Sequence, residues 1–349
     1  MTRGSIRQAA NLSTACATLR SQSQRPTEIT APDIQQAIRL LNRQVLETLA
    51  HRLDSEGSLA QLAANEETRQ ELESLLSRIR YRERLSENVG PSLRGQINPG
   101  VRALLSGPSG TGKTLAARLL AAELSLDIYR IDLSTVVNKY IGETEKNLNR
   151  LFSHAEELDV VLLLDEGDSL LTQRTAVGNA NDRYANLETN YLLQRIESFQ
   201  GILIITTNAG DRIDQAFQRR MDVVIEFPMP DPAERWEIWT SHLPDNHQVS
   251  SAFLTEVVAR CALSGAQIRN VVLHASLLAL QETSAAGSQP ASISDLWLNQ
   301  ALQREYRKAG AICPIKFIAP QPAPVEVPSA LFTHAKKTPA ASARSRKGS

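Results

Sequence analysis

One glycine-rich run in the sequence has the residue types and the spacing of a phosphate-binding loop. It lies between an apolar stretch at 101–105, which predicts a strand, and residues 115–124, which have the pattern of a helix. Glycines let successive backbone N–H groups curve around phosphate oxygens, and the start of a helix adds positive potential. A glycine-rich turn that binds nothing is the alternative, but every fixed position and both flanks fit the phosphate-binding pattern. The run consists of Gly107, Pro108, Ser109, Gly110, Thr111, Gly112, Lys113 and Thr114.

The end of this run and a second motif together predict ATP and Mg²⁺ as ligands. We expect Lys113 to reach the β- and γ-phosphates and Thr114 to place its hydroxyl on Mg²⁺. An apolar strand predicted at 160–164 ends in Asp165 and Glu166, at the sheet edge where α/β proteins bind ligands. There Asp165 would hold the Mg²⁺ and Glu166 would polarise the attacking water. Acids that end a strand can simply be solvated, but their place about fifty residues after a P-loop favours the chemical role.

Two weaker signals follow along the chain. Asn208 ends a predicted strand at 202–206 and could contact the attacking water or the γ-phosphate, although Asn-Ala-Gly-Asp is also typical of a turn. Arg219 and Arg220 carry the rigid, always-charged fork that suits a phosphoryl transition state. Paired arginines are more often ordinary surface charges, so the sequence leaves both readings open.

Composition narrows the classes of function. The 349 residues can form two or three domains. The formal net charge is zero, so no overall field attracts nucleic acid or an anionic membrane. The longest apolar run, 160–164, is far too short to span a bilayer. Three widely spaced cysteines without a CxxC pair, and no apolar signal segment near the start, predict a reducing, cytoplasmic location.

The elements that would position these residues divide the chain into five parts. Alternating strands and helices predict an α/β fold with a parallel sheet covered on both faces, in three layers. Ahead of it, Ile34 to Leu53 have apolar residues at steps of three or four, which indicates an amphipathic helix whose stripe is core or a partner-binding face. The expected parts are a disordered or loosely helical start (1–28), a helical N-terminal segment (29–87), an α/β domain (88–230), a helical lid domain (231–310), and a disordered basic tail (311–349).

Taken in order, these motifs resemble the AAA family of hexameric ring ATPases. The resemblance covers about residues 88 to 310 and includes Phe227-Pro228-Met229-Pro230-Asp231 after the arginines. It implies a P-loop NTPase domain with a helical lid, ATP and Mg²⁺ as ligands, and a homohexameric ring. It also implies that Asn208 senses the γ-phosphate and that Arg219 and Arg220 are fingers that reach the neighbouring subunit's nucleotide.

The lid and one loop carry further implications of this resemblance. Ser264-Gly265-Ala266 would lie by the adenine and ribose, with Gly265 and Ala266 as nucleotide-binding residues. Some relatives carry a sensing arginine directly after this Gly-Ala pair, whereas this chain has Gln267, and Arg269 is one helical step round. Tyr140, Ile141 and Gly142 match the aromatic-aliphatic-glycine loop that grips a polypeptide in the ring's pore. An apolar pair before glycine can also be a packed loop, and the residues alone leave that open.

A narrower resemblance covers residues 160–221. The segments Asp-Glu-Gly-Asp-Ser-Leu-Leu and Ala-Phe-Gln-Arg-Arg-Met-Asp are similar to those of the AAA ATPases of extracellular contractile injection systems, which are phage-tail-like particles. Tyr140-Ile141-Gly142 favours a motor that remodels or helps assemble a protein substrate, and the narrower resemblance makes contractile-particle components the candidates. A nucleic-acid motor or loader is an alternative that the zero net charge disfavours. A nucleotide-dependent scaffold with little turnover is another, disfavoured by the intact acids Asp165 and Glu166.

Overall fold

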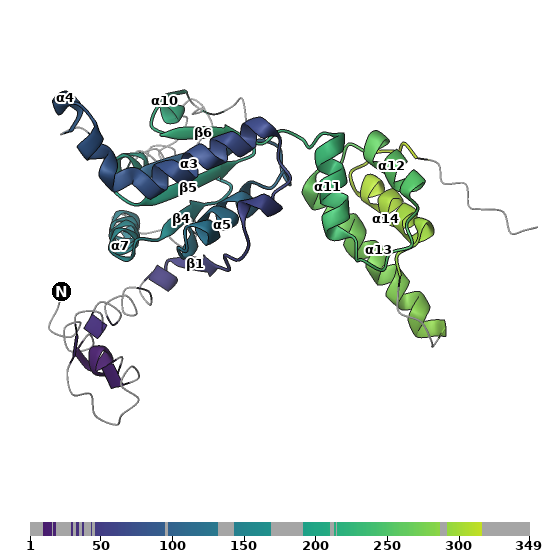
Figure 1. The fold of residues 1–349 in the computed structure, drawn as a ribbon, viewed down its shortest axis with the longest axis horizontal. Coiled ribbons are helices and arrows are strands. Elements are labelled where there is room, and N and C mark those ends of the chain that lie inside the picture. The colour runs from purple at the N-terminus through teal and green to yellow at the C-terminus, as the bar shows by residue number, and fades with distance from the viewer. Residues whose placement is uncertain are drawn as a thin grey trace, which may run out of the picture.

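The computed structural model has a sheet-and-helix part that contains the P-loop and a smaller, all-helical part that follows it (Figure 1). No helix among the described residues combines the length and apolar character that a bilayer crossing requires. The structure describes residues 10–15, 17–18, 29–30, 33–34, 37, 43, 46–94, 97–131, 143–168, 191–209, 213, 215–286 and 292–315.

Six strands form one sheet in the order β1-β3-β4-β5-β2-β6. β2 to β6 are parallel to one another, which confirms the predicted parallel sheet, and only β1 runs antiparallel, at the edge beside β3. Because β2, β4 and β5 are neighbours and parallel, the loops after them open at the same edge of the sheet. The strands are β1 (Ala50–Leu53), β2 (Val101–Ser106), β3 (Ile128–Ile131), β4 (Val161–Leu164), β5 (Ile202–Thr207) and β6 (Val223–Glu226).

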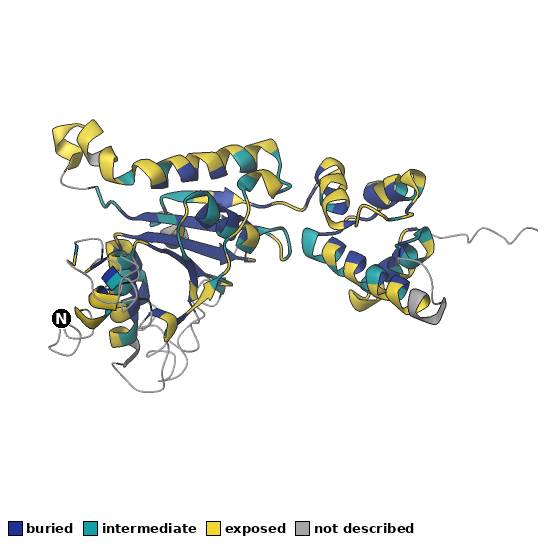
Figure 2. Cartoon of the chain, turned by 60° about the horizontal axis from the view of Figure 1, so that its bottom comes forward, coloured by how far each residue is buried: buried dark blue, intermediate teal, exposed yellow. Residues whose placement is uncertain are grey.

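The central strands are mostly apolar because helices cover both faces of the sheet. Successive side chains of a strand point to opposite faces, and accordingly Leu162 and Leu164 join one core while Val161 and Leu163 join the other. Figure 2 shows the central strands as buried and the outer faces of the helices as exposed. One face is covered by α3 (Glu66–Leu85) and α5 (Lys113–Glu123), and the other by α7 (Glu143–Leu158) and the helix at 191–198.

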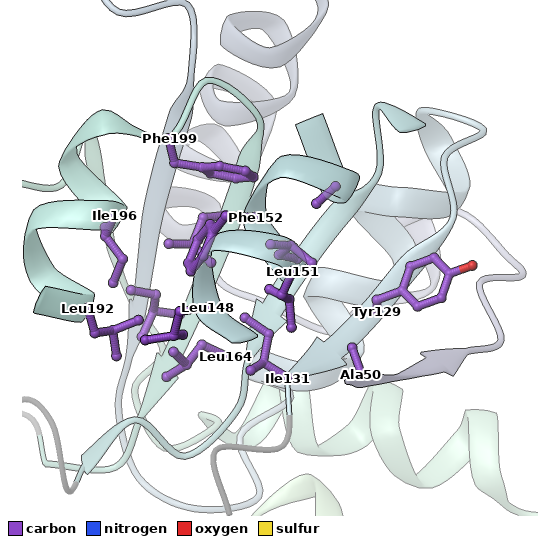
Figure 3. Packing of buried hydrophobic residues seen from close by; sticks show 14 of the residues in the cluster. Ala50, Tyr129, Ile131, Leu148, Leu151, Phe152, Leu164, Leu192, Ile196 and Phe199 are labelled. Atoms are coloured by element: carbon purple, nitrogen blue, oxygen red, sulfur yellow. The ribbon is translucent and has the colours of Figure 1, made fainter. Parts of the chain in front are cut away.

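Aromatic packing fixes the helices on the second face (Figure 3). Phe152 of α7 meets Phe199 edge-to-face, with ring centroids 4.9 Å apart and an interplanar angle of 76°. The guanidinium of Arg195 lies 5.3 Å from the centroid of the Phe152 ring. Edge-to-face pairs of this kind add about 0.5–1.5 kcal/mol to the burial of their area. This contact holds the helix at 191–198 and the start of β5 against the sheet that bears the site.

The helical part forms its own core around Trp239, which is fully buried. Its first helix starts where the sequence specifies: Asp231 and Glu234 form a reciprocal capping box, and Pro232 occupies the first turn. The core extends past the predicted end of the lid at residue 310, because Cys313 and Ile315 are also buried in it. The helices are α11 (Pro232–His242), α12 (Ser251–Arg260), α13 (Gly265–Ala286) and α14 (Asp295–Lys308).

The region before residue 88 differs from the separate helical segment that the sequence predicts. Described residues up to Glu47 are helical in part, but Ala50–Leu53 is the edge strand β1, paired with β3 from Ala50 opposite Ile131 to Leu53 opposite Ile128. An apolar spacing of four over so short a stretch does not distinguish a helix end from a strand. The apolar side of α3 is buried in the same core as α5. Residues 50–85 therefore pack as part of the α/β domain.

The remaining predictions for the start of the chain fall mostly outside the described residues. Residues 10–15 and 17–18, in the stretch expected to be disordered or loosely helical, are helical. Along the chain, two short helices lie between α3 and β2: η2 (Ser86–Asn88) and α4 (Pro91–Arg94). A third, η1 (Leu59–Gln61), precedes α3.

Candidate nucleotide-binding site

The glycine-rich run forms the turn between β2 and α5, and its backbone requires glycine at particular positions. Gly107 and Gly110 have φ values of 143° and 81°. A Cβ on Gly107 would lie 2.1 Å from the carbonyl oxygen of Phe227, and one on Gly110 would lie 2.7 Å from Ser264 Oγ. Gly112, with φ of 103°, precedes the first residue of α5 and provides no side-chain cap. The first N–H groups of α5 are thus left without a side-chain acceptor from this position, as a phosphate site requires.

Lys113 is turned inward over this loop. Its side chain is buried, at 6% exposure for the residue, and Nζ donates to the carbonyl oxygens of Gly107 and Pro108, both at 2.7 Å, and to Asn208 Oδ1 at 2.9 Å. Burial lowers the pKa of the Lys113 ammonium, and the nearby carboxylates, Asp168 first among them, oppose this shift. All three donors of the ammonium therefore have acceptors within the chain.

Thr114 and Asp165 come together as expected for a pair of magnesium ligands. Thr114 Oγ1 donates to Asp165 Oδ1 at 2.9 Å, and Thr206 Oγ1 donates to the same oxygen at 2.6 Å. Hydroxyl and carboxylate oxygens are the ligands that Mg²⁺ prefers, and the ion keeps several of its waters. This donor set fits the ion, although the described residues contain no cluster of three His, Cys, Asp or Glu that could hold a metal by themselves.

Glu166 has an unusual backbone for its residue type. Its φ is 55°, in the left-handed region that costs a non-glycine residue roughly 1–2 kcal/mol. Thr206 holds this conformation, because Glu166 N donates to Thr206 Oγ1 at 3.1 Å and Gly167 N donates to the Thr206 carbonyl at 2.9 Å. The Glu166 residue is exposed. A left-handed backbone held by neighbouring groups is typical of functional sites.

Asp168 also belongs to the site, although the sequence analysis does not single it out. Its Oδ1 accepts a short hydrogen bond from Thr207 Oγ1 and one of 2.9 Å from Asn208 N. Its Oδ2 lies 3.5 Å from Asn208 Nδ2. In the sequence, Asp168 is an additional acid two residues after Glu166. Acids are too common at helix starts for this one to be singled out before the fold is known.

The lid meets the P-loop at the predicted residues. Ala266 N donates to the Gly110 carbonyl at 3.1 Å. Ser264 N donates to Gln267 Oε1 at 2.9 Å and Gln267 N donates to Ser264 Oγ at 3.4 Å, which is a capping box at the start of α13. Gln267 thus has a structural role at the position where some AAA relatives carry an arginine.

A cavity of about 500 Å³ lies beside the P-loop and the lid. Its volume is in the range of small-molecule sites, which is roughly 300–1,000 Å³. Arg269 lines this cavity. In the sequence it is one helical step away from Gln267, the position at which some relatives carry a sensing arginine. The segment 60–63, which no motif marks, forms a further wall because β1 and α3 bring it there. The lining residues include Ala60, Gln61, Leu62, Ala63, Leu115, Glu237, Ile238, Ser241, His242, Gly265 and Ala266.

Arg219 and Arg220 lie at the other end of the strands. Asp222, just after them, donates its backbone N–H to the Arg102 carbonyl at 2.8 Å, near the start of β2, whereas the P-loop follows the end of β2. A six-residue strand is about 17 Å long, so the two arginines are remote from their own P-loop. Arg219 is exposed, and Arg220 forms an ion pair with Glu197.

The structure therefore brings together most, but not all, of the predicted residues. The P-loop, Asp165, Glu166, Asn208, Gly265 and Ala266 converge at one edge of the sheet, and the two arginines do not. The predicted pore-loop residues Tyr140, Ile141 and Gly142 lie outside the described residues.

A glycine-rich loop between a parallel strand and a helix, with a buried lysine and a Thr–Asp pair that joins this helix to the end of β4, defines a P-loop NTPase. The family described as "ATPase family associated with various cellular activities (AAA)" matches residues 103–229, which include the P-loop, Asp165, Glu166 and Asn208.

Known relatives agree with this assignment. The chain is 34% identical over 201 residues to the proteasome-activating nucleotidase of Aeropyrum pernix, covering 54% of this chain and 48% of that one. It is 31% identical over 194 residues to the 26S proteasome subunit RPT4 of Saccharomyces cerevisiae, covering 53% and 44%. The crystal structure of the FIGL-1 AAA domain in complex with ADP has the same fold, with a TM-score of 0.58 at 22% identity, covering 75% of this chain and 90% of that one. The chain spans about half the length of the curated relatives it matches.

Proposed function

We propose that this chain hydrolyses ATP to ADP and phosphate with Mg²⁺. The observation that carries the proposal is the convergence of Lys113, Thr114, Asp165 and Asn208 beside a solvent-exposed Glu166. Lys113 would bind the phosphates once it leaves its backbone acceptors, and Thr114 and Asp165 would hold the ion. Bound Mg²⁺ would offset the negative charge of the phosphates. Glu166 would take a proton from the attacking water, and Asn208 would orient that water or the γ-phosphate.

We further propose that the working unit is a homohexameric ring. The remoteness of Arg219 and Arg220 from the P-loop of their own chain supports this, because a guanidinium can then act only on a neighbour's nucleotide. The exposure of Arg219 fits that role. The resemblance of this chain to the hexameric AAA family also supports the ring.

The substrate we propose is a protein. The predicted pore-loop residues Tyr140, Ile141 and Gly142 support it, together with relatives whose names refer to the proteasome. Contractile injection particles are the particular candidate, which rests on the sequence resemblance over residues 160–221. Neighbouring genes for tail sheath, tube and baseplate would test this candidate directly.

Glu166→Gln tests the reaction itself. The amide keeps the shape of the side chain but cannot act as a base, so ATP should bind normally while turnover falls by roughly 10²–10⁴-fold. Phosphate release and nucleotide binding should be measured for both proteins, with and without added DNA or unfolded protein. Stimulation by DNA alone would contradict the protein-remodelling proposal, and turnover within a few-fold of wild type would contradict the role of Glu166.

A further inference from the structure

The Asp168 carboxylate makes several hydrogen bonds with the end of β5 and the residue that follows it. Its carboxylate accepts from Thr207 Oγ1, from Asn208 N and, at 3.5 Å, from Asn208 Nδ2. Thr207 is fully buried, and its Oγ1 also accepts from Ala209 N at 3.0 Å. Side chain and backbone of Asn208 are thus both attached to one carboxylate that projects from the segment following β4.

These contacts decide which way the Asn208 carboxamide points. An amide has a donating Nδ2 and an accepting Oδ1, and its orientation is set by its partners. Asp168 can only accept, so it attracts Nδ2, and Oδ1 is left to face Lys113 Nζ at 2.9 Å. In the opposite orientation, Oδ1 would face the carboxylate and Nδ2 would face the ammonium, and both contacts would be repulsive.

We propose that Asp168 is a positioning residue that orients the Asn208 carboxamide toward Lys113. Through Asn208, it controls the rate of ATP hydrolysis. This inference rests on the proposed ATPase function and deepens it. Lys113 is the group that would exchange Asn208 for phosphate oxygens, so the carboxamide must be in a fixed orientation when that exchange occurs. An acid is required because an amide at position 168 would present a donor of its own to Asn208 Nδ2.

Asp168→Asn is the variant that tests the orientation. The oxygen of the new side chain can still accept hydrogen bonds from Thr207 Oγ1 and Asn208 N, so the two main hydrogen bonds of this segment are kept. Its amide nitrogen would meet Asn208 Nδ2, donor against donor, and turn the carboxamide round. We expect kcat to fall at least about tenfold while KM for ATP stays within about threefold, and Asp168→Glu, which keeps both acceptors, to recover part of kcat.

A double-mutant cycle separates this role from a merely structural one. In the Asn208→Ala background, Asp168→Asn should change kcat by less than about twofold, because the residue it positions is gone. An equal fold-loss in both backgrounds, or no loss in the single variant, would overturn the inference. If Asp168→Asn does not fold, Asp168→Ala, which removes both acceptors, is carried through the same cycle.

A second measurement does not depend on turnover. In the nucleotide-free protein, acylation of Lys113 by an amine reagent, followed by mass spectrometry, should be several-fold faster in both Asn208→Ala and Asp168→Asn than in wild type. Unchanged labelling in both variants would overturn the proposed connection from Asp168 to Lys113. If the wild-type protein hydrolyses no ATP but Lys113 is still labelled faster in the two variants, the proposed ATPase function is contradicted. The positioning role of Asp168 is then still supported.

Discussion

Thr114 Oγ1 donates to Asp165 Oδ1 at 2.9 Å, which joins the end of the P-loop to the end of β4. The two residues are 51 positions apart in the chain, and the contact exists because β2 and β4 are both neighbours of β5 in a parallel sheet. Thr206 of β5 donates to the same oxygen. Oxygen atoms from α5, the end of β4 and β5 therefore meet at one carboxylate.

Asp165→Asn should weaken the use of Mg²⁺. The amide loses the negative charge that attracts a divalent cation, while its shape still fits beside Thr114. We expect the Mg²⁺ concentration for half-maximal hydrolysis to rise at least about tenfold, measured by phosphate release over a magnesium titration. An unchanged titration curve would show that Asp165 is not near the ion.

Lys113→Ala should abolish ATP binding, because the triphosphate loses its main side-chain partner in the loop. The substitution also removes the buried ammonium that bridges the loop and Asn208, so melting temperature should be measured as a control. Titration calorimetry reports the affinity directly. Wild-type affinity in a folded variant would contradict the P-loop assignment.

Hydrolysis should require two subunits, because Arg219 and Arg220 lie far from the P-loop of their own chain. Chains with Arg219→Ala and Arg220→Ala keep an intact pocket, and chains with Lys113→Ala keep intact arginines. Each alone should be inactive, whereas mixed rings should recover part of the turnover. Absence of recovery, in rings shown by mass measurement to contain both chains, would argue against arginines acting in trans.

Tyr140→Ala should separate hydrolysis from work on the substrate. Tyr140 is outside the phosphate-binding motifs, so basal ATP turnover should stay within a few-fold of wild type. Loss of an aromatic contact costs on the order of 0.5–1.5 kcal/mol beyond its area, and a ring repeats that loss in every subunit. Substrate-stimulated turnover should therefore fail, while Tyr140→Phe should retain much of it. Normal remodelling by Tyr140→Ala would contradict a pore-loop role.

The parts of the site that local sequence specifies could be predicted. The glycine spacing and the acids after an apolar strand each depend on neighbours within a few positions, and the strands β2, β4 and β5 fall on the predicted apolar stretches. The parts that depend on distant pairing could not. β1 is a strand because β3 lies beside it, the 60–63 wall depends on β1 and α3, and Asp168 matters only because β4 and β5 are neighbours.

The pairing of β1 with β3 also bears on how the chain avoids edge-to-edge pairing with strands of other molecules. Without β1, the N–H and C=O groups of β3 would form an open edge, and an apolar open edge is a template for adding strands from other molecules. β1 closes that edge with a short segment whose middle residues, His51 and Arg52, are exposed, and the Arg52 guanidinium donates to Asp127 at 2.7 Å. A polar, charged strand is a poor partner for further pairing. A shortened chain that starts at residue 88 would lose this cover together with α3, and should precipitate where the full chain remains dispersed.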